Sequence, residues 1–175
     1  ATSTLTVSSS LNNFRLESPR ESGLVGYWKF DEGTGTSTRD WSGNGNILLL
    51  GITSSTIPVA TSTVSSTIVF DNPYSLQFDG TNDYASSTTS ISGVKTVSFW
   101  SYSTTTNASF LDLTGTAYIN ATGTAVNAGG FTSPTYYVNG VSSNSTRTTS
   151  TWQYIAVTTD TGIDATAFNV GRINT

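Results

Sequence analysis

Apolar and polar residues alternate along much of this chain with the period of two that is typical of β-strands. The clearest run is KTVSFWSYS at residues 95–103, where Val97 and Phe99 fall on one face and Trp100 and Tyr102 on the other. Because both faces carry apolar groups, we expect a central strand with one face on the core and the other in a groove or under a loop.

Similar runs predict about nine or ten strands separated by turn residues. No window shows a sustained helical period. The pattern therefore predicts an all-β chain that folds as an antiparallel two-sheet sandwich or jelly roll. The other expected strands are residues 24–30, 47–51 and 67–70, a hairpin around Asp79-Gly80, two strands around Gly115, a hairpin tipped by Asn139-Gly140, and residues 151–159 and 167–173.

The first 22 residues differ from the rest. They are rich in Ser and Thr, and the segment RLESPRES at residues 15–22 carries four charged residues and a proline. We therefore divide the chain into an N-terminal extension, residues 1–22, and a domain, residues 23–175. The extension is either a linker or, at residues 4–8, an edge or donor strand, and the pattern leaves both interpretations open.

The composition and the charge argue against two classes of function, nucleic-acid binding and membrane insertion. Charged residues make up only 10% of the chain and the net charge is −4. Since Lys and Arg form no cluster, we expect no nucleic-acid surface. No apolar run approaches the roughly 20 residues that span a bilayer, so we also expect no membrane insertion.

The chain contains neither Cys nor His. This excludes disulfides, cysteine nucleophiles, Ser-His-Asp triads and the usual zinc sites. Asp31 and Glu32 are adjacent, so on a strand they point to opposite faces and make a poor acid–base pair. We expect no enzymatic activity.

A glycine-rich loop follows residues 24–30 and holds a candidate calcium site. Asp31, Asp40, Asn44 and Asn46 supply the oxygen ligands that Ca²⁺ prefers. The alternative is that glycines with positive φ and side-chain hydrogen bonds only shape the turn. A second, weaker candidate cluster consists of Asp79, Asn82 and Asp83.

Sugar binding requires exposed aromatic rings together with a few polar partners. Aromatic residues in a sandwich are more often part of the core. We expect Trp28, Phe99 and Trp152 in the core, and we name as candidate ligand-binding residues Trp41, Tyr74, Trp100 and Tyr102.

Six segments together resemble the laminin G-like, or concanavalin A-like, jelly-roll domain, and in particular its bacterial branch. In chain order they are GLVGYWKFDEGTG…RDWSGNGN, SLQFDGTNDYA, TVSFW, YYVNGV, WQYIAVTTD and FNVGRI, and the resemblance covers residues 23–173. It implies a jelly-roll fold in a superfamily of lectins, adhesion modules, pentraxins and glucanases. Related domains often bind calcium, whereas the close carboxylate run of the glucanases has no counterpart here.

The chain departs from this branch at its end. Members usually continue after the VGRI-like strand into an acidic, aromatic strand that pairs beside the first strand, whereas this sequence ends at Thr175. An uncovered sheet edge exposes unpaired backbone groups. We expect residues 4–8, a strand from a neighbouring subunit, or chain that the sequence does not include to cover that edge.

These observations predict a non-catalytic recognition or adhesion module at the surface of a bacterium or archaeon, or secreted from it. By analogy with the family, its partner is a glycan, or else another surface protein. The alternative is a structural subunit of a surface filament or layer that assembles by strand complementation. Sequons at Asn107, Asn120 and Asn144 fit an exported chain.

Overall fold

The computed structural model describes residues 22–51, 59–62 and 74–174. These residues form strands and turns and contain no helix, which confirms the all-β prediction. Residues 67–70, for which a strand was predicted, and residues 4–8, for which a strand was one of two interpretations, lie outside the described residues. The strands are β1 (Ser37–Thr38), β2 (Leu48–Leu50), β3 (Val59–Ser62), β4 (Tyr74–Gln77), β5 (Ala85–Ser87), β6 (Ile91–Tyr102), β7 (Ala108–Asp112), β8 (Tyr118–Thr122), β9 (Ala125–Gly129), β10 (Thr135–Val138), β11 (Val141–Ser142), β12 (Trp152–Ala165) and β13 (Asn169–Val170).

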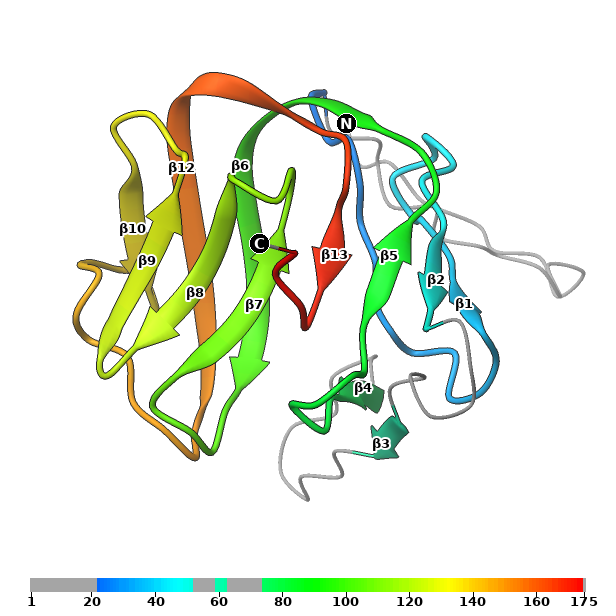
Figure 1. The fold of residues 1–175 in the computed structure, drawn as a ribbon, viewed down its shortest axis with the longest axis horizontal. Coiled ribbons are helices and arrows are strands. Elements are labelled where there is room, and N and C mark those ends of the chain that lie inside the picture. Colours follow the sequence, from blue (N-terminus) through cyan, green and yellow to red (C-terminus); the bar gives the residue numbers. More distant parts are fainter. Residues whose placement is uncertain (1–21, 52–58, 63–73, 175) are drawn as a thin grey trace, which may run out of the picture.

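The strands form two large sheets and one small pair. One sheet has seven strands in the order β1-β2-β5-β13-β7-β8-β9, and the other has four in the order β11-β10-β12-β6. The four-stranded sheet lies behind the seven-stranded sheet in Figure 1. β3 and β4 pair only with each other, and every described ladder is antiparallel. Two stacked antiparallel layers make this fold a β-sandwich.

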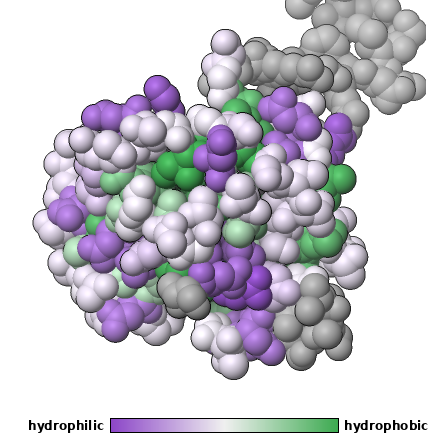
Figure 2. Space-filling model, turned by 45° about the horizontal axis from the view of Figure 1, so that its top comes forward, coloured by the Kyte–Doolittle hydropathy of each residue, from purple (hydrophilic) through white to green (hydrophobic). Residues whose placement is uncertain are grey.

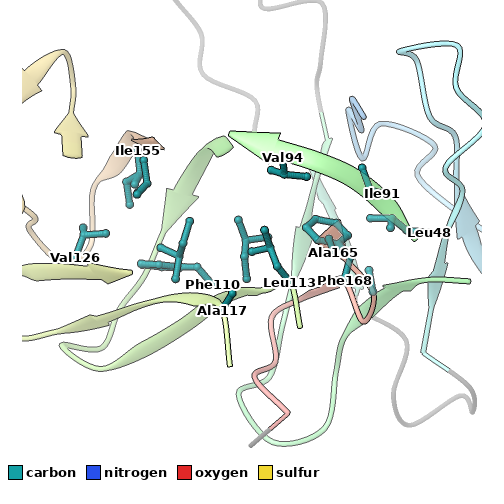
Figure 3. Packing of buried hydrophobic residues seen from close by; sticks show 14 of the residues in the cluster. Leu48, Ile91, Val94, Phe110, Leu113, Ala117, Val126, Ile155, Ala165 and Phe168 are labelled. Carbon is teal, nitrogen blue, oxygen red and sulfur yellow. The ribbon is translucent and has the colours of Figure 1, made fainter. Parts of the chain in front are cut away.

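The hydrophobic core fills the space between the two sheets. Leu111, Ile119 and Val126 enter it from the seven-stranded sheet, and Ile155 and Val157 enter it from β12. Figure 3 shows Ile155 and Phe110 on facing layers. On the surface drawn in Figure 2, pale, weakly polar residues predominate and strongly hydrophilic residues form separate groups, as a chain rich in Ser and Thr should produce.

The prediction that residues 24–30 form a strand was wrong. The segment joins no ladder among the described residues, and Phe30 has a positive φ of 57°. Its apolar alternation arises because Trp28 and Phe30 pack against the core, with the Trp28 ring stacked on Phe168 at 5.1 Å. Hydrogen bonds to a following loop, described below, replace the missing ladder.

Two predictions about strand neighbours were also wrong. β6 is the last described strand of the four-stranded sheet rather than a central one. The segment around Asp79-Gly80 is not a hairpin, because β4 pairs with β3 whereas β5 pairs with β2 and β13. The Asp79 carboxylate accepts hydrogen bonds from the backbone N–H groups of Thr81 and Asn82. These hydrogen bonds stabilise a turn that connects β4, in the two-stranded sheet, with β5, in the seven-stranded sheet.

The hairpin around Asn139-Gly140 is confirmed. β10 pairs with β11, with Val138 opposite Val141. Asn139 and Gly140 have positive φ values of 51° and 81°. Two consecutive positive φ values at the tip are what a type I′ turn requires, and Asn-Gly is the pair that adopts them most easily.

A pair of glycine variants tests the turns that close β8 and β9. Gly130 and Gly123 both have positive φ, so alanine should cost about 1 kcal/mol at either position. At Gly130 a Cβ atom would also lie 2.5 Å from the Thr116 carbonyl oxygen, whereas at Gly123 it would meet nothing within 4 Å. We expect Gly130→Ala to lower the free energy of unfolding by about 3 kcal/mol and Gly123→Ala by about 1 kcal/mol in urea titrations. Equal losses of stability in the two variants would contradict the close approach of Gly130 to the Thr116 carbonyl oxygen.

Candidate functional site

The outer face of the four-stranded sheet carries five exposed aromatic rings. Residues directly opposite each other in an antiparallel ladder share a face. The register places Tyr102 opposite Trp152 and Trp100 opposite Tyr154, and one step further along it places Tyr137 opposite Ala156. We call this surface the aromatic face; its rings are Trp100, Tyr102, Tyr137, Trp152 and Tyr154.

The rings of the aromatic face form pairs across the strands. The Trp100 and Tyr154 ring centroids are 5.5 Å apart, and those of Tyr102 and Trp152 are 5.7 Å apart. Both pairs are tilted by just over 50°, a favourable arrangement for aromatic rings. Trp100 nevertheless leaves 61% of its surface exposed, and the other four rings leave 37–49% exposed. Four of the five rings are thus held in pairs, and all five remain accessible to a ligand.

The remaining side chains of the aromatic face are small and uncharged. They follow from the same register: Thr96, Ser98, Thr135, Ser142, Ala156 and Thr158. The first charged side chain beyond them on β12 is Asp160, next to the hydroxyl end of the face and away from the rings. The face therefore combines aromatic rings with hydroxyl groups and carries no charged side chain at these positions.

The backbone beneath the rings is firmly held. Gln153, Ile155 and Val157 alternate with the ring-bearing positions of β12 and are buried. The Asn139 side-chain oxygen accepts a hydrogen bond from the Tyr154 N–H, and the Asn139 N–H donates to the Tyr154 carbonyl. A ladder and a closed turn thus fix the backbone that carries the rings, so that a ligand would not have to order that backbone.

The structure separates the four predicted ligand-binding residues. Trp100 and Tyr102 lie together on the aromatic face, whereas Trp41 and Tyr74 belong to other parts of the chain. The prediction that Trp152 lies in the core was wrong, because it is exposed beside Tyr102. Sequence analysis also missed Tyr137 and Tyr154. Their alternation with buried Val138 and Ile155 was visible, but the register between strands was not.

Trp41 has cationic neighbours. The guanidinium carbon of Arg39 lies 4.5 Å from the centroid of its ring, and the Lys29 ammonium lies 5.0 Å from it. Lys29 also forms an ion pair with Asp31, with 2.7 Å between Nζ and Oδ2. Tyr74 lies on β4 with its ring next to Gly33. Both rings are exposed and lie away from the aromatic face, and ligand binding at Trp41 and Tyr74 stays a prediction.

The loop of residues 40–46, which we call the Asp40 loop, binds the backbone of residues 24–30. One oxygen of Asp40, Oδ1, accepts hydrogen bonds from the N–H groups of Tyr27 and Ser42, and the other accepts one from Asn46. In return, the Trp41 N–H donates to the Tyr27 carbonyl. The carboxylate thus takes the place of a neighbouring strand.

The two asparagines of the Asp40 loop extend the same contact. The Asn44 amide donates to the Leu24 carbonyl, and the Asn46 amide donates to the Val25 carbonyl. The Asn46 side-chain oxygen accepts a hydrogen bond from Thr89. Asp40, Asn44 and Asn46 thus all contact the segment 24–30, whereas Asp31 is paired with Lys29.

The electrostatics of the Asp40 loop fit a carboxylate that stays ionised. Burial alone would raise the pKa of Asp40, but hydrogen bonds from the Ser42 side chain and from the N–H groups of Tyr27, Asn46 and Ser42 outweigh this effect. They hold the pKa below its usual value. No group of three carboxylates gathers anywhere in the part of the chain that the structure describes. Calcium binding at Asp31, Asp40, Asn44 and Asn46 stays a prediction, and the hydrogen bonds of the Asp40 loop are those of a structural turn.

Asp79, the first residue of the second candidate cluster, likewise stabilises the turn in which it lies. Hydrogen bonds from the backbone of Thr81 and Asn82 lower the pKa of Asp79. Asp83 accepts a hydrogen bond from the Asp79 N–H. At the sequons, Asn107 and Asn144 are exposed, and Asn120 is half-buried and accepts a hydrogen bond from Asn127.

Comparison of the chain with protein-family models, with curated proteins and with solved structures found no match. Within the described residues, no helix has the length and apolarity needed to cross a membrane.

Proposed function

We propose that the protein is a non-catalytic recognition module that binds glycans through the aromatic face. The five exposed rings on one rigid sheet face carry this proposal. Sugar rings present apolar C–H faces that stack on aromatic side chains, and their hydroxyl groups bind short polar side chains such as those of Ser and Thr. Exposed apolar area of this kind on a soluble domain marks a binding surface.

The place of action that we propose is the cell surface or the extracellular space. The resemblance to laminin G-like jelly rolls supports it, since that superfamily contains lectins and adhesion modules. The scarcity of charge and the abundance of Ser and Thr also support it. Fold resemblance alone does not specify a ligand, and for this reason the proposal depends on the rings.

Removing two rings should abolish glycan binding. We expect Trp100→Ala combined with Trp152→Ala to weaken binding to any glycan retained in a glycan-array screen by more than tenfold, because one ring of each tilted pair is lost. The matched control is Trp41→Ala, which removes an exposed tryptophan away from the aromatic face. An unchanged melting temperature would show that both variants fold.

The comparison between these variants decides the location of binding. Loss of binding in the double variant alone supports the aromatic face. Loss in Trp41→Ala alone would place binding near the Asp40 loop and contradict this assignment. If the unmodified protein binds no glycan, the proposed function fails.

A second candidate function is a structural subunit that assembles by strand complementation. β6 is a long strand, and one of its edges has no ladder partner among the described residues. Such an edge is a template for a strand from another chain. This function predicts polymers in light scattering and electron microscopy that disappear when residues 1–12 are deleted. A protein that stays monomeric at high concentration would contradict it.

A further inference from the structure

We propose that the aromatic face takes an extended, uncharged, β-linked polysaccharide that lies along the sheet, rather than a single sugar or an anionic glycan. This inference rests on the proposed function and specifies the chemical class of its ligand. Three observations support it: the spacing of the rings, the absence of charge around them, and their exposure on an open face.

The spacing of the rings fits a chain of several sugars. Tyr102 and Trp152 share one level of the ladder, Trp100 and Tyr154 share the next level on this face, and Tyr137 lies one level beyond. Successive levels on one face are two residues apart, which is roughly 7 Å along an antiparallel strand. The rings therefore extend over roughly 14 Å, more than one sugar ring can cover.

The lack of charged side chains on the aromatic face argues against an anionic polymer. The positions that share the face in the described ladder, from Thr96 to Tyr102 on β6 and from Trp152 to Thr158 on β12, carry no charged side chain. The nearest charged residues along the two strands are Lys95, directly before Thr96 on β6, and Asp160 on β12, and both lie beyond the Thr96–Thr158 pair, at the end of the face away from the rings. Sulfated glycans and uronic acid polymers need Lys or Arg as partners. A neutral polymer loses nothing on a surface without cations.

The open geometry of the aromatic face favours a flat ligand. Each ring is more than a third exposed and stands on a strand rather than in the wall of a pocket. A ligand can therefore be contacted from one side only. Equatorial β-linkages give a ribbon whose sugars turn their C–H faces to the same surface, whereas α-linked chains coil and present few rings at once.

Many weak contacts along one chain also imply a dependence on length. Each stacked sugar contributes little, but further contacts along the same chain are intramolecular and add to the affinity. Affinity should therefore rise steeply from disaccharide to hexasaccharide and should level off when the chain covers all five rings.

The test uses the full chain and its Trp100→Ala/Trp152→Ala variant. Binding is measured by affinity electrophoresis in gels that contain a neutral β-glucan, neutral amylose, heparin or alginate, and by pull-down on insoluble cellulose and chitin. Calorimetry with cello- and chito-oligosaccharides of two to six units measures the dependence on length. Light scattering of both proteins, with and without oligosaccharide, reports their association state.

The inference requires retention by at least one neutral β-linked polymer, affinity that rises at least tenfold from two to six units, and loss of both in the double variant. Retention by heparin or alginate alone, by amylose alone, or equal affinity for two and six units would overturn it while leaving a glycan-binding function in place. Absence of all glycan binding would overturn the proposed function as well. A dimer that the double variant converts to monomer would assign the face to a second copy of the chain and would also overturn the inference.

Discussion

Replacing Asp40 by alanine should lower the free energy of unfolding by about 3 kcal/mol, because three backbone N–H groups lose their acceptor together. They belong to Tyr27, Ser42 and Asn46 and lie 2.8–3.0 Å from the carboxylate oxygens. Asp40 is 5% exposed, so water cannot easily replace it. Urea titration of the variant and the unmodified protein measures the loss. Asp160→Ala, at an exposed position of β12, should change stability by less than about 0.5 kcal/mol.

The contribution of Asp40 to the free energy of unfolding should also depend on pH. Its pKa is lowered in the folded protein, so the folded state favours the ionised form. The stabilisation is complete above the unfolded pKa of about 3.9 and is lost as the pH falls through the lower, folded pKa. Between pH 6 and pH 3 the unmodified protein should lose more stability than Asp40→Asn, which cannot ionise. Parallel pH profiles for the two proteins would contradict this role of the carboxylate.

Replacing Arg147 by methionine should cost about 3 kcal/mol as well. The guanidinium group is buried and donates hydrogen bonds to the carbonyl oxygens of Thr105, Thr106 and Gly123. It also lies 5.6 Å from the centroid of the Phe110 ring. Burial lowers the pKa of Arg147, but the group remains charged at neutral pH. Methionine would keep much of the packing volume and leave three carbonyl groups without their donor.

Two further variants make the Arg147 prediction specific. Arg147→Lys keeps the charge, but a single ammonium group cannot reproduce the planar fork that reaches three carbonyls, so most of the loss should remain. Arg39→Met removes an exposed arginine whose guanidinium lies over the Trp41 ring, and it should cost at most about 1 kcal/mol. A full rescue by lysine would show that charge alone matters at this position. Equal effects of Arg147→Met and Arg39→Met would contradict the loop contacts of Arg147.

Arg147 also shows a limit of sequence analysis. Its partners lie 24–42 positions away in the chain, in the connection from β6 to β7 and in the turn between β8 and β9. Nothing in the local sequence NSTRTTS distinguishes a buried arginine from a solvated one. Only the meeting of three loops at one end of the sandwich creates its site.

The candidate site was partly predictable for a related reason. Alternation along β6 correctly placed Trp100 and Tyr102 on the face opposite Val97 and Phe99. It did not show which strand lies beside β6, and therefore Trp152 was assigned to the core instead of to the exposed partner of Tyr102. The ring pairs depend on the register between strands that are about 50 residues apart in the chain.

The sequence by itself determined the fold class, the long strands β6 and β12, the Asn139-Gly140 hairpin and the absence of His and Cys chemistry. These features depend on side-chain alternation, local turn geometry and composition, all of which are properties of short segments. The tertiary structure alone decided that residues 24–30 are held by the Asp40 loop instead of a strand and that five rings share one open face. Each of these outcomes requires groups distant in the chain to meet, and their pairing depends on the packing of the whole sandwich.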